Sequence, residues 1–160
     1  MADFFITRSP EETVRAGELL ASLLEPGDVV ALTGDLGAGK THLVQGVARG
    51  LGVQEPVSSP TFNLLVVHPG RVPLCHFDLY RLEHSAELDD IGFAEMLESG
   101  GVSMIEWGDK FPEELPSDHL AVIIRVGEGD ERTFEVLAGG PRSTQMASGW
   151  LAACEKAGFR

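Results

Sequence analysis

The first half of the chain alternates short apolar runs with segments whose apolar residues recur every three or four positions. Residues 4–6 and 28–33 are apolar or β-branched runs and predict strands. Between these runs, apolar residues at helical spacing predict a helix that ends at Pro26 and Gly27. These apolar residues are Val14, Leu19, Leu20, Leu23 and Leu24. A second set of such residues predicts a helix over residues 42–52, with Leu43, Val44, Val47, Ala48 and Leu51 on one side.

The second half continues this pattern. Strands are expected up to His68 and over residues 72–78 and 102–107, and a hairpin is expected from residues 120–126 and 132–137. Helices are expected over residues 83–98, with a break at Gly92 and Phe93, and over residues 143–159. Strands that alternate with helices predict an α/β fold with a mostly parallel sheet. The length suits a single domain over residues 1–160.

The segment between the strand at 28–33 and the helix at 42–52 matches the phosphate-loop pattern of Gly, four residues, then Gly-Lys-Ser/Thr. It consists of Gly34, Asp35, Leu36, Gly37, Ala38, Gly39, Lys40 and Thr41. A chance match is the alternative in a chain with 19 glycines, although from average residue usage the bare pattern arises by accident in only roughly one chain of this size in a hundred or more. A preceding strand and a following helix make an accidental match rarer, so the segment predicts nucleotide binding.

Each part of this loop has a physical role in that prediction. Glycines allow backbone N–H groups to turn inward around a phosphate, and the helix N-terminus adds partial positive charge. Lys40 is expected to contact the outer phosphates, and the hydroxyl of Thr41 is expected to bind magnesium.

Two predicted strands end in an acid. Asp78 ends one and Glu106 lies near the end of the other, so a parallel sheet would bring both to its carboxyl edge, where they can bind magnesium or position water. Asp78 is alternatively a helix cap. Trp107 is either a core residue or a cover for the nucleotide or a partner.

Three further features each allow more than one interpretation. The loop with Ser59, Pro60 and Thr61 is either a switch that senses the terminal phosphate or an ordinary connection. Arg132 can stack on a base or pair with an acid, although a scaffold role is the simpler interpretation. Arg81 is the candidate for an arginine finger, which a partner would otherwise supply.

Net charge, hydropathy and cysteine spacing argue against several classes of function. The net charge of −13 argues against strong direct nucleic-acid binding by this chain alone. There is no apolar run of membrane-spanning length and no secretion signal, and Cys75 and Cys154 lack metal or redox spacing. A cytoplasmic protein with reduced thiols and no membrane association is therefore expected.

Taken together, the motifs resemble the bacterial TsaE proteins, also called YjeE, over about two thirds of the chain. The matching motifs, in order, are the phosphate loop, Ser59 to Phe62, His76 to Arg81, Gly92-Phe93 and Ile105 to Trp107. The resemblance implies a P-loop NTPase-type three-layer fold and an ATPase that uses Mg²⁺. In it, Thr41 and Glu106 would hold the metal, Asp78 would share the site, and Ser59 to Thr61 would act as a switch.

The resemblance also implies partners. TsaE proteins act with the TsaB–TsaD pair, which transfers a threonylcarbamoyl group to the adenosine beside the tRNA anticodon, and they drive turnover of that complex. Tyr80, Arg81 and Trp107 would line the site or meet a partner. His42, next to the phosphate-loop Thr41, is expected to bind the nucleotide together with the loop, although it departs from the family, in which Thr is usual at this position.

Two other functions fit the motifs. A small-molecule kinase would need an acceptor pocket and usually a basic lid, whereas the 12 Lys and Arg residues are scattered along this sequence. A nucleotide-gated interaction module would bind ATP without useful catalysis. The Asn-Lys-x-Asp pattern that reads guanine is absent, which favours ATP over GTP.

Overall fold

The computed structural model describes residues 3–35, 37–58, 60 and 64–160. These residues form one seven-stranded sheet in the order β1-β7-β6-β2-β5-β4-β3. Its strands are β1 (Phe4–Thr7), β2 (Val29–Gly34), β3 (Leu65–His68), β4 (Leu74–Asp78), β5 (Val102–Glu106), β6 (Leu120–Val126) and β7 (Arg132–Ala138). The central strands β6, β2, β5 and β4 are parallel, and the outer pairs β1–β7, β6–β7 and β3–β4 are antiparallel.

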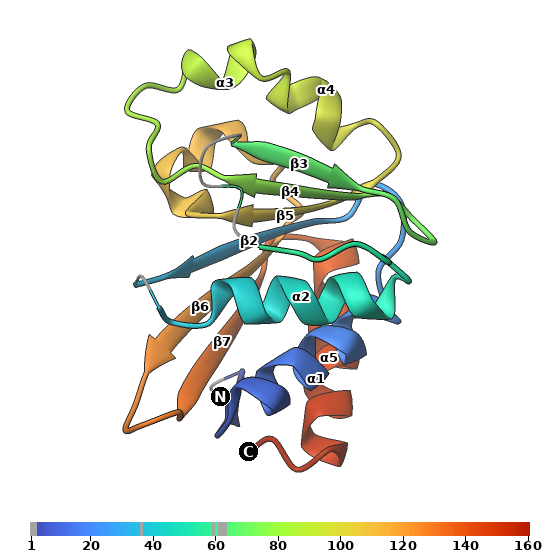
Figure 1. The fold of residues 1–160 in the computed structure, drawn as a ribbon, viewed down its shortest axis with the longest axis vertical. Helices are drawn as coiled ribbons and strands as arrows, with labels where there is room; N and C mark the ends of the chain where they lie inside the picture. The colour runs from blue at the N-terminus through green and yellow to red at the C-terminus, as the bar shows by residue number, and fades with distance from the viewer. Residues whose placement is uncertain (1–2, 36, 59, 61–63) are drawn as a thin grey trace.

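Helices cover both faces of the sheet, which confirms the predicted three-layer α/β fold. The helices α1 (Pro10–Ala21), α2 (Lys40–Gly50) and α5 (Pro141–Lys156) lie on one side, and the short helices α3 (Glu87–Asp90) and α4 (Phe93–Leu97) lie on the other (Figure 1). Each face has its own apolar core. Within the described part of the chain, every helix is too short or too polar to cross a lipid bilayer.

Alternation along the strands decides which side chains meet α2. On β4, Cys75 and Phe77 belong to the core under α3 and α4, so His76 and Asp78 face the opposite side, toward α2. On β5, Met104 lies in the α2 core, and Glu106 follows two residues later on the same face. The polar side chains of β4 and β5 therefore share a face with the phosphate loop.

Close contact between α1 and α2 fixes the helix that follows the phosphate loop. A Cβ atom on Gly46 would lie 2.0 Å from the carbonyl oxygen of Val14, and one on Gly17 would lie 2.4 Å from that of Leu43. Only glycine permits the two backbones to approach so closely. The pair of glycines thus sets the position of α2 against α1.

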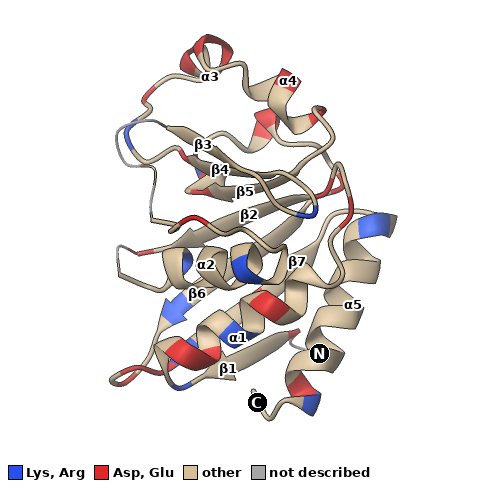
Figure 2. Cartoon of the chain, turned by 45° about the vertical axis from the view of Figure 1, so that its right-hand side comes forward, with Lys and Arg blue, Asp and Glu red and all other residues tan. Residues whose placement is uncertain are grey.

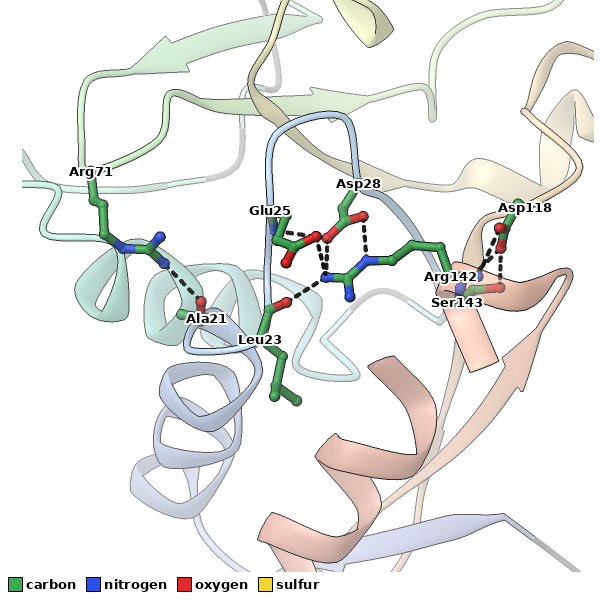
Figure 3. Close-up of polar contacts among 8 residues, drawn as sticks. All are labelled: Ala21, Leu23, Glu25, Asp28, Arg71, Asp118, Arg142 and Ser143. Carbon is green, nitrogen blue, oxygen red and sulfur yellow. Dashed lines mark hydrogen bonds and ion pairs between the residues drawn. The ribbon is translucent and has the colours of Figure 1, made fainter. Parts of the chain in front are cut away.

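A polar network lies at the end of the sheet where β2 begins, away from the phosphate loop. The guanidinium of Arg142, from α5, donates two hydrogen bonds of 3.0 and 2.8 Å to the carboxylate of Asp28, just before β2 (Figure 3). It also donates to the carbonyl of Leu23. Because Asp28 precedes β2 and the phosphate loop follows β2, this network lies at the edge of the sheet opposite the loop.

Several elements differ in extent from the sequence prediction. The expected helix over residues 83–98 is two short helices on either side of the predicted break at Gly92, which has a left-handed φ of 66°, and the first of them begins only at Glu87. The last helix begins at Pro141 instead of Ser143, because Asp118 accepts hydrogen bonds from the backbone amides of Arg142 and Ser143. The first helix ends at Ala21, before the predicted Pro26-Gly27 stop.

Candidate functional site

The phosphate loop connects the end of β2 to the first turn of α2, as the motif requires. Gly37 and Gly39 have positive φ angles of 80° and 110°, which other residues rarely adopt. Gly39 is the N-cap of α2 and provides no side-chain hydrogen bond to the helix amides. The first amides of α2 are thus left to an external acceptor, for which an anion is well suited. Leu36 lies outside the described residues.

Lys40 begins α2 and is nearly enclosed, with 5% of its surface exposed. Its Nζ atom donates hydrogen bonds to the backbone oxygens of Gly34 at 2.5 Å and Asp35 at 2.9 Å. Burial lowers the pKa of the Lys40 ammonium, an effect opposed by the nearby carboxylates of Glu106 and Asp78. The lysine therefore lies between the loop backbone and the acidic end of the sheet.

Asp78 and Glu106 are paired residues at the ends of the parallel strands β4 and β5. Both are buried, with 8% and 3% of their surfaces exposed. Asp78 Oδ1 accepts a hydrogen bond of 3.0 Å from the amide of Tyr80 in a local turn, and the helix cap considered as its alternative role is wrong, because the next helix begins only at Glu87 with Ala86 as its N-cap. Glu106 Oε2 is 2.5 Å from Nε2 of His76.

These parts surround one cavity of about 350 Å³. Its lining comes from the phosphate loop, from the segment after β4 and from the end of β5; the residues are Gly37, Gly39, Lys40, Thr41, His42, Asp78, Tyr80, Arg81, Glu106 and Trp107. All ten are residues that the sequence assigned to the site. The volume is within the range of small-molecule sites.

Aromatic residues form one wall of this cavity. Lys40 Nζ lies 4.5 Å from the centre of the Trp107 ring, and Trp107 and Tyr80 rings are 4.9 Å apart. Trp107 has a positive φ of 62°, a strained conformation for a large side chain. Lys110, which the sequence did not single out, donates to the carbonyl of Tyr80 at 2.7 Å and so holds the segment after β4 in place.

The remaining predicted residues lie around the cavity or beyond the described chain. Arg132 does not line the cavity; its Nε atom donates to the carbonyl of Ala38 at 3.1 Å and supports the loop from outside. Pro60 is buried, whereas Ser59 and Thr61 of the expected switch lie outside the described residues.

Comparison with known proteins agrees with this arrangement. Residues 7–134 match the family described as "Threonylcarbamoyl adenosine biosynthesis protein TsaE". The chain belongs to the TsaE family. It is 46% identical to the tRNA threonylcarbamoyladenosine biosynthesis protein TsaE of Treponema pallidum, over 82% of this chain and 97% of that one. It is 42% identical to the protein of the same name in Bacillus subtilis, over 85% of each chain.

A solved structure is similar as well. The crystal structure of YdiB from Bacillus subtilis superposes with a TM-score of 0.81, at 34% identity, over 95% of both chains. The sheet and helices described above are thus shared with a solved structure, and the family match confirms the family resemblance predicted from the motifs.

The oxygen donors at the site fit magnesium. Thr41, Asp78 and Glu106 supply one hydroxyl and two carboxylates to the same cavity. Among the described residues, no three His, Cys, Asp or Glu side chains converge to form a complete cage. Mg²⁺ suits such a partial donor set, because it usually takes one or two carboxylates and completes its shell with water and substrate phosphates.

Sequence reasoning missed one buried partner in this TsaE-family site. His76 is fully buried on β4, two residues before Asp78, and contacts Glu106 directly. His76 and Asp78 alternate with apolar neighbours in the sequence, a pattern typical of a strand with one polar face, but the partner on β5 depends on strand register. Such register is set by pairing between distant segments and is not visible in a local pattern.

Proposed function

We propose that this chain is a magnesium-dependent ATPase that supports threonylcarbamoyladenosine modification of tRNA in the cytoplasm, acting with a TsaB–TsaD complex. The observation that carries the proposal is the convergence of Lys40, Thr41, Asp78 and Glu106 on one cavity beside the phosphate loop. A basic group, a hydroxyl and two carboxylates in that arrangement are what phosphoryl transfer from a nucleotide requires.

Each group has a role in the proposed reaction. The α2 amides and the Lys40 ammonium would bind the phosphates and offset the charge that develops on the transferring group. Thr41 and Glu106 would hold magnesium, which when bound neutralises charge on the outer phosphates. Asp78, also at the cavity, would orient the attacking water or a metal-bound water. The Trp107 and Tyr80 rings would limit access of bulk water.

Turnover by the isolated chain should be slow. Arg81 lines the cavity and is the candidate arginine finger within this chain. We propose that a partner supplies the arginine that reaches the transferring phosphate, a group that contributes a factor of about 10³–10⁵ in the enzymes that use one. The partner would also contact the tRNA, since Lys and Arg are dispersed over this chain and acids gather on α3 and α4 (Figure 2).

The test is ATP hydrolysis measured with and without TsaB–TsaD, together with an assay for modified tRNA. We expect slow hydrolysis alone and faster hydrolysis with the pair. Glu106→Ala should lose hydrolysis and tRNA modification together. Equal rates with and without the pair would contradict the proposed partnership. Modification that persists in Glu106→Ala and still requires ATP would favour a nucleotide-gated module over an ATPase.

A further inference from the structure

His76 is an unusual residue for the middle of a central strand. None of its surface is exposed, and its neighbours on the same face of β4 and β5 include Leu74 and Met104 of the apolar core. Placing a polar ring there costs free energy unless its nitrogen atoms are paired. Only Nε2 has a partner within the described structure, at 2.5 Å from Glu106 Oε2, and Nδ1 has none.

The chemistry of the two groups fixes the direction of this hydrogen bond. A carboxylate has no hydrogen to give, so Nε2 of His76 is the donor and Oε2 of Glu106 the acceptor. In the neutral imidazole, Nδ1 is then the ring nitrogen without a hydrogen, so no N–H group is left without an acceptor. One tautomer thus explains both the contact and the unpaired atom.

The bond has a consequence for the cavity. Glu106 lines the cavity, and its Oε2 atom accepts the hydrogen bond from His76, so Oε1 is the oxygen left for a ligand. A carboxylate on a strand end can rotate about its side-chain torsions, and a hydrogen bond to a fully enclosed ring removes that freedom. Removing a hydrogen-bond partner that fixes a metal ligand in this way typically weakens metal binding by about 10–100-fold.

We propose that His76 is a positioning residue: it holds Glu106 by one oxygen so that the other meets the magnesium–nucleotide complex. This inference rests on the proposed function, because it assumes that Glu106 contacts the metal. The side chain of His76 itself touches neither metal nor nucleotide in this account.

The chain offers a matched set of variants. His76→Leu removes the donor at similar volume, and His76→Asn keeps a polar group too short to reach Glu106. His76→Gln places an amide hydrogen near the position of Nε2 and should restore the bond. His68→Leu is the control, because His68 on β3 is also buried and also contacts a glutamate, but that glutamate, Glu55, does not line the cavity whereas Glu106 does.

The readout is calorimetric affinity for ADP, measured once with Mn²⁺ as the probe ion and once with EDTA. We expect His76→Leu and His76→Asn to weaken Mn²⁺-dependent binding by about 10–100-fold and to leave binding in EDTA unchanged. His76→Gln should recover most of the affinity, and His68→Leu should match the wild-type protein in both conditions. If His76→Leu fails to fold, His76→Asn and His76→Gln supply the comparison.

Three results would overturn the inference. Wild-type Mn²⁺ dependence in His76→Leu and His76→Asn would show that the bond does not position the metal ligand. An equal loss with Mn²⁺ and with EDTA would indicate a general structural defect. A His76→Gln variant as weak as His76→Asn would exclude the hydrogen bond as the cause. Absence of ADP binding by the wild-type protein would instead reject the proposed function, and the inference with it.

Discussion

The Nζ atom of Lys40 lies 4.5 Å from the centre of the Trp107 indole ring. A cation at that distance over an aromatic face is attracted to the ring electrons, by about 0.5–2 kcal/mol depending on solvent exposure. The contact joins the last part of the phosphate loop, at the start of α2, to the residue that follows β5. A ligand that draws the ammonium toward its phosphates should therefore change the surroundings of the indole.

The first prediction follows from this contact. Titration with Mg-ADP should change the tryptophan fluorescence, and Trp107→Phe should lose the response. The second tryptophan, Trp150, is fully buried and donates its ring N–H to the carbonyl of Ala16, so it should not respond. A response that survives in Trp107→Phe and disappears in Trp150→Phe would contradict the assignment.

The second prediction concerns the contact of α1 with α2. Gly46→Ala should destabilise the protein by about 1–3 kcal/mol, since its Cβ would overlap the Val14 carbonyl oxygen. The matched control is Gly149→Ala in α5, whose nearest neighbours are side-chain atoms of Leu23 at 3.2 Å or more. At Gly149 the higher helix propensity of alanine, worth up to about 1 kcal/mol, should offset the cost of a small shift of the Leu23 side chain. Urea unfolding measures the stability of both variants. Equal stability would argue against the close contact between the backbones of α1 and α2.

The third prediction is a pH dependence at the start of α5. Hydrogen bonds from Ser143, and then from the amide of Arg142, lower the pKa of the Asp118 carboxyl below its ordinary 3.8. A depressed folded-state pKa contributes stability above pH 3.8 that is lost as the pH falls through the folded-state value. Asp118→Asn should therefore be less stable than wild type at pH 7, and the difference should shrink below about pH 4.

Unfolding in urea at pH 7, 4 and 3 would measure this difference. Asp130→Asn, in the exposed turn between β6 and β7, is the control for a change of one charge. A constant gap between Asp118→Asn and wild type over this range would contradict the assignment of the effect to the carboxylate.

The fourth prediction concerns the thiols. Burial raises the pKa of Cys154 to about 12 and also raises that of Cys75. Because the thiolate is the reactive form, neither cysteine should react with an aromatic disulfide reagent at pH 8 in the folded protein. In denaturant both should react. A fast equivalent of reaction under native conditions would show that one thiol is accessible.

Much of the fold and site was predictable from local pattern. The phosphate loop has a fixed spacing, and the acids Asp78 and Glu106 stand at the ends of apolar runs, so parallel strands had to bring them to one edge. The hairpin of β6 and β7 was also visible, because both strands and their turn are contiguous. These features need only residues that are close in the sequence.

The parts that were missed are the start of one helix and two contacts between distant segments. The predicted break at Gly92 is present, but the residues before Glu87, which were expected to be helical, stay outside a helix. The Nε2 atom of His76 meets Glu106 because β4 and β5 pair in one register. A scaffold role was the simpler interpretation of Arg132 and agrees with its bond to the Ala38 carbonyl, but that partner depends on the hairpin passing beside the loop. Neither contact leaves a periodic signal.

Nucleotide binding at the phosphate loop can be measured by calorimetric titration of Mg-ATP into the wild-type protein, Lys40→Ala and the exposed control Lys156→Ala. We expect a single binding event in wild type and Lys156→Ala, and loss of detectable binding in Lys40→Ala. No heat with the wild-type protein, or unchanged affinity in Lys40→Ala, would contradict this expectation.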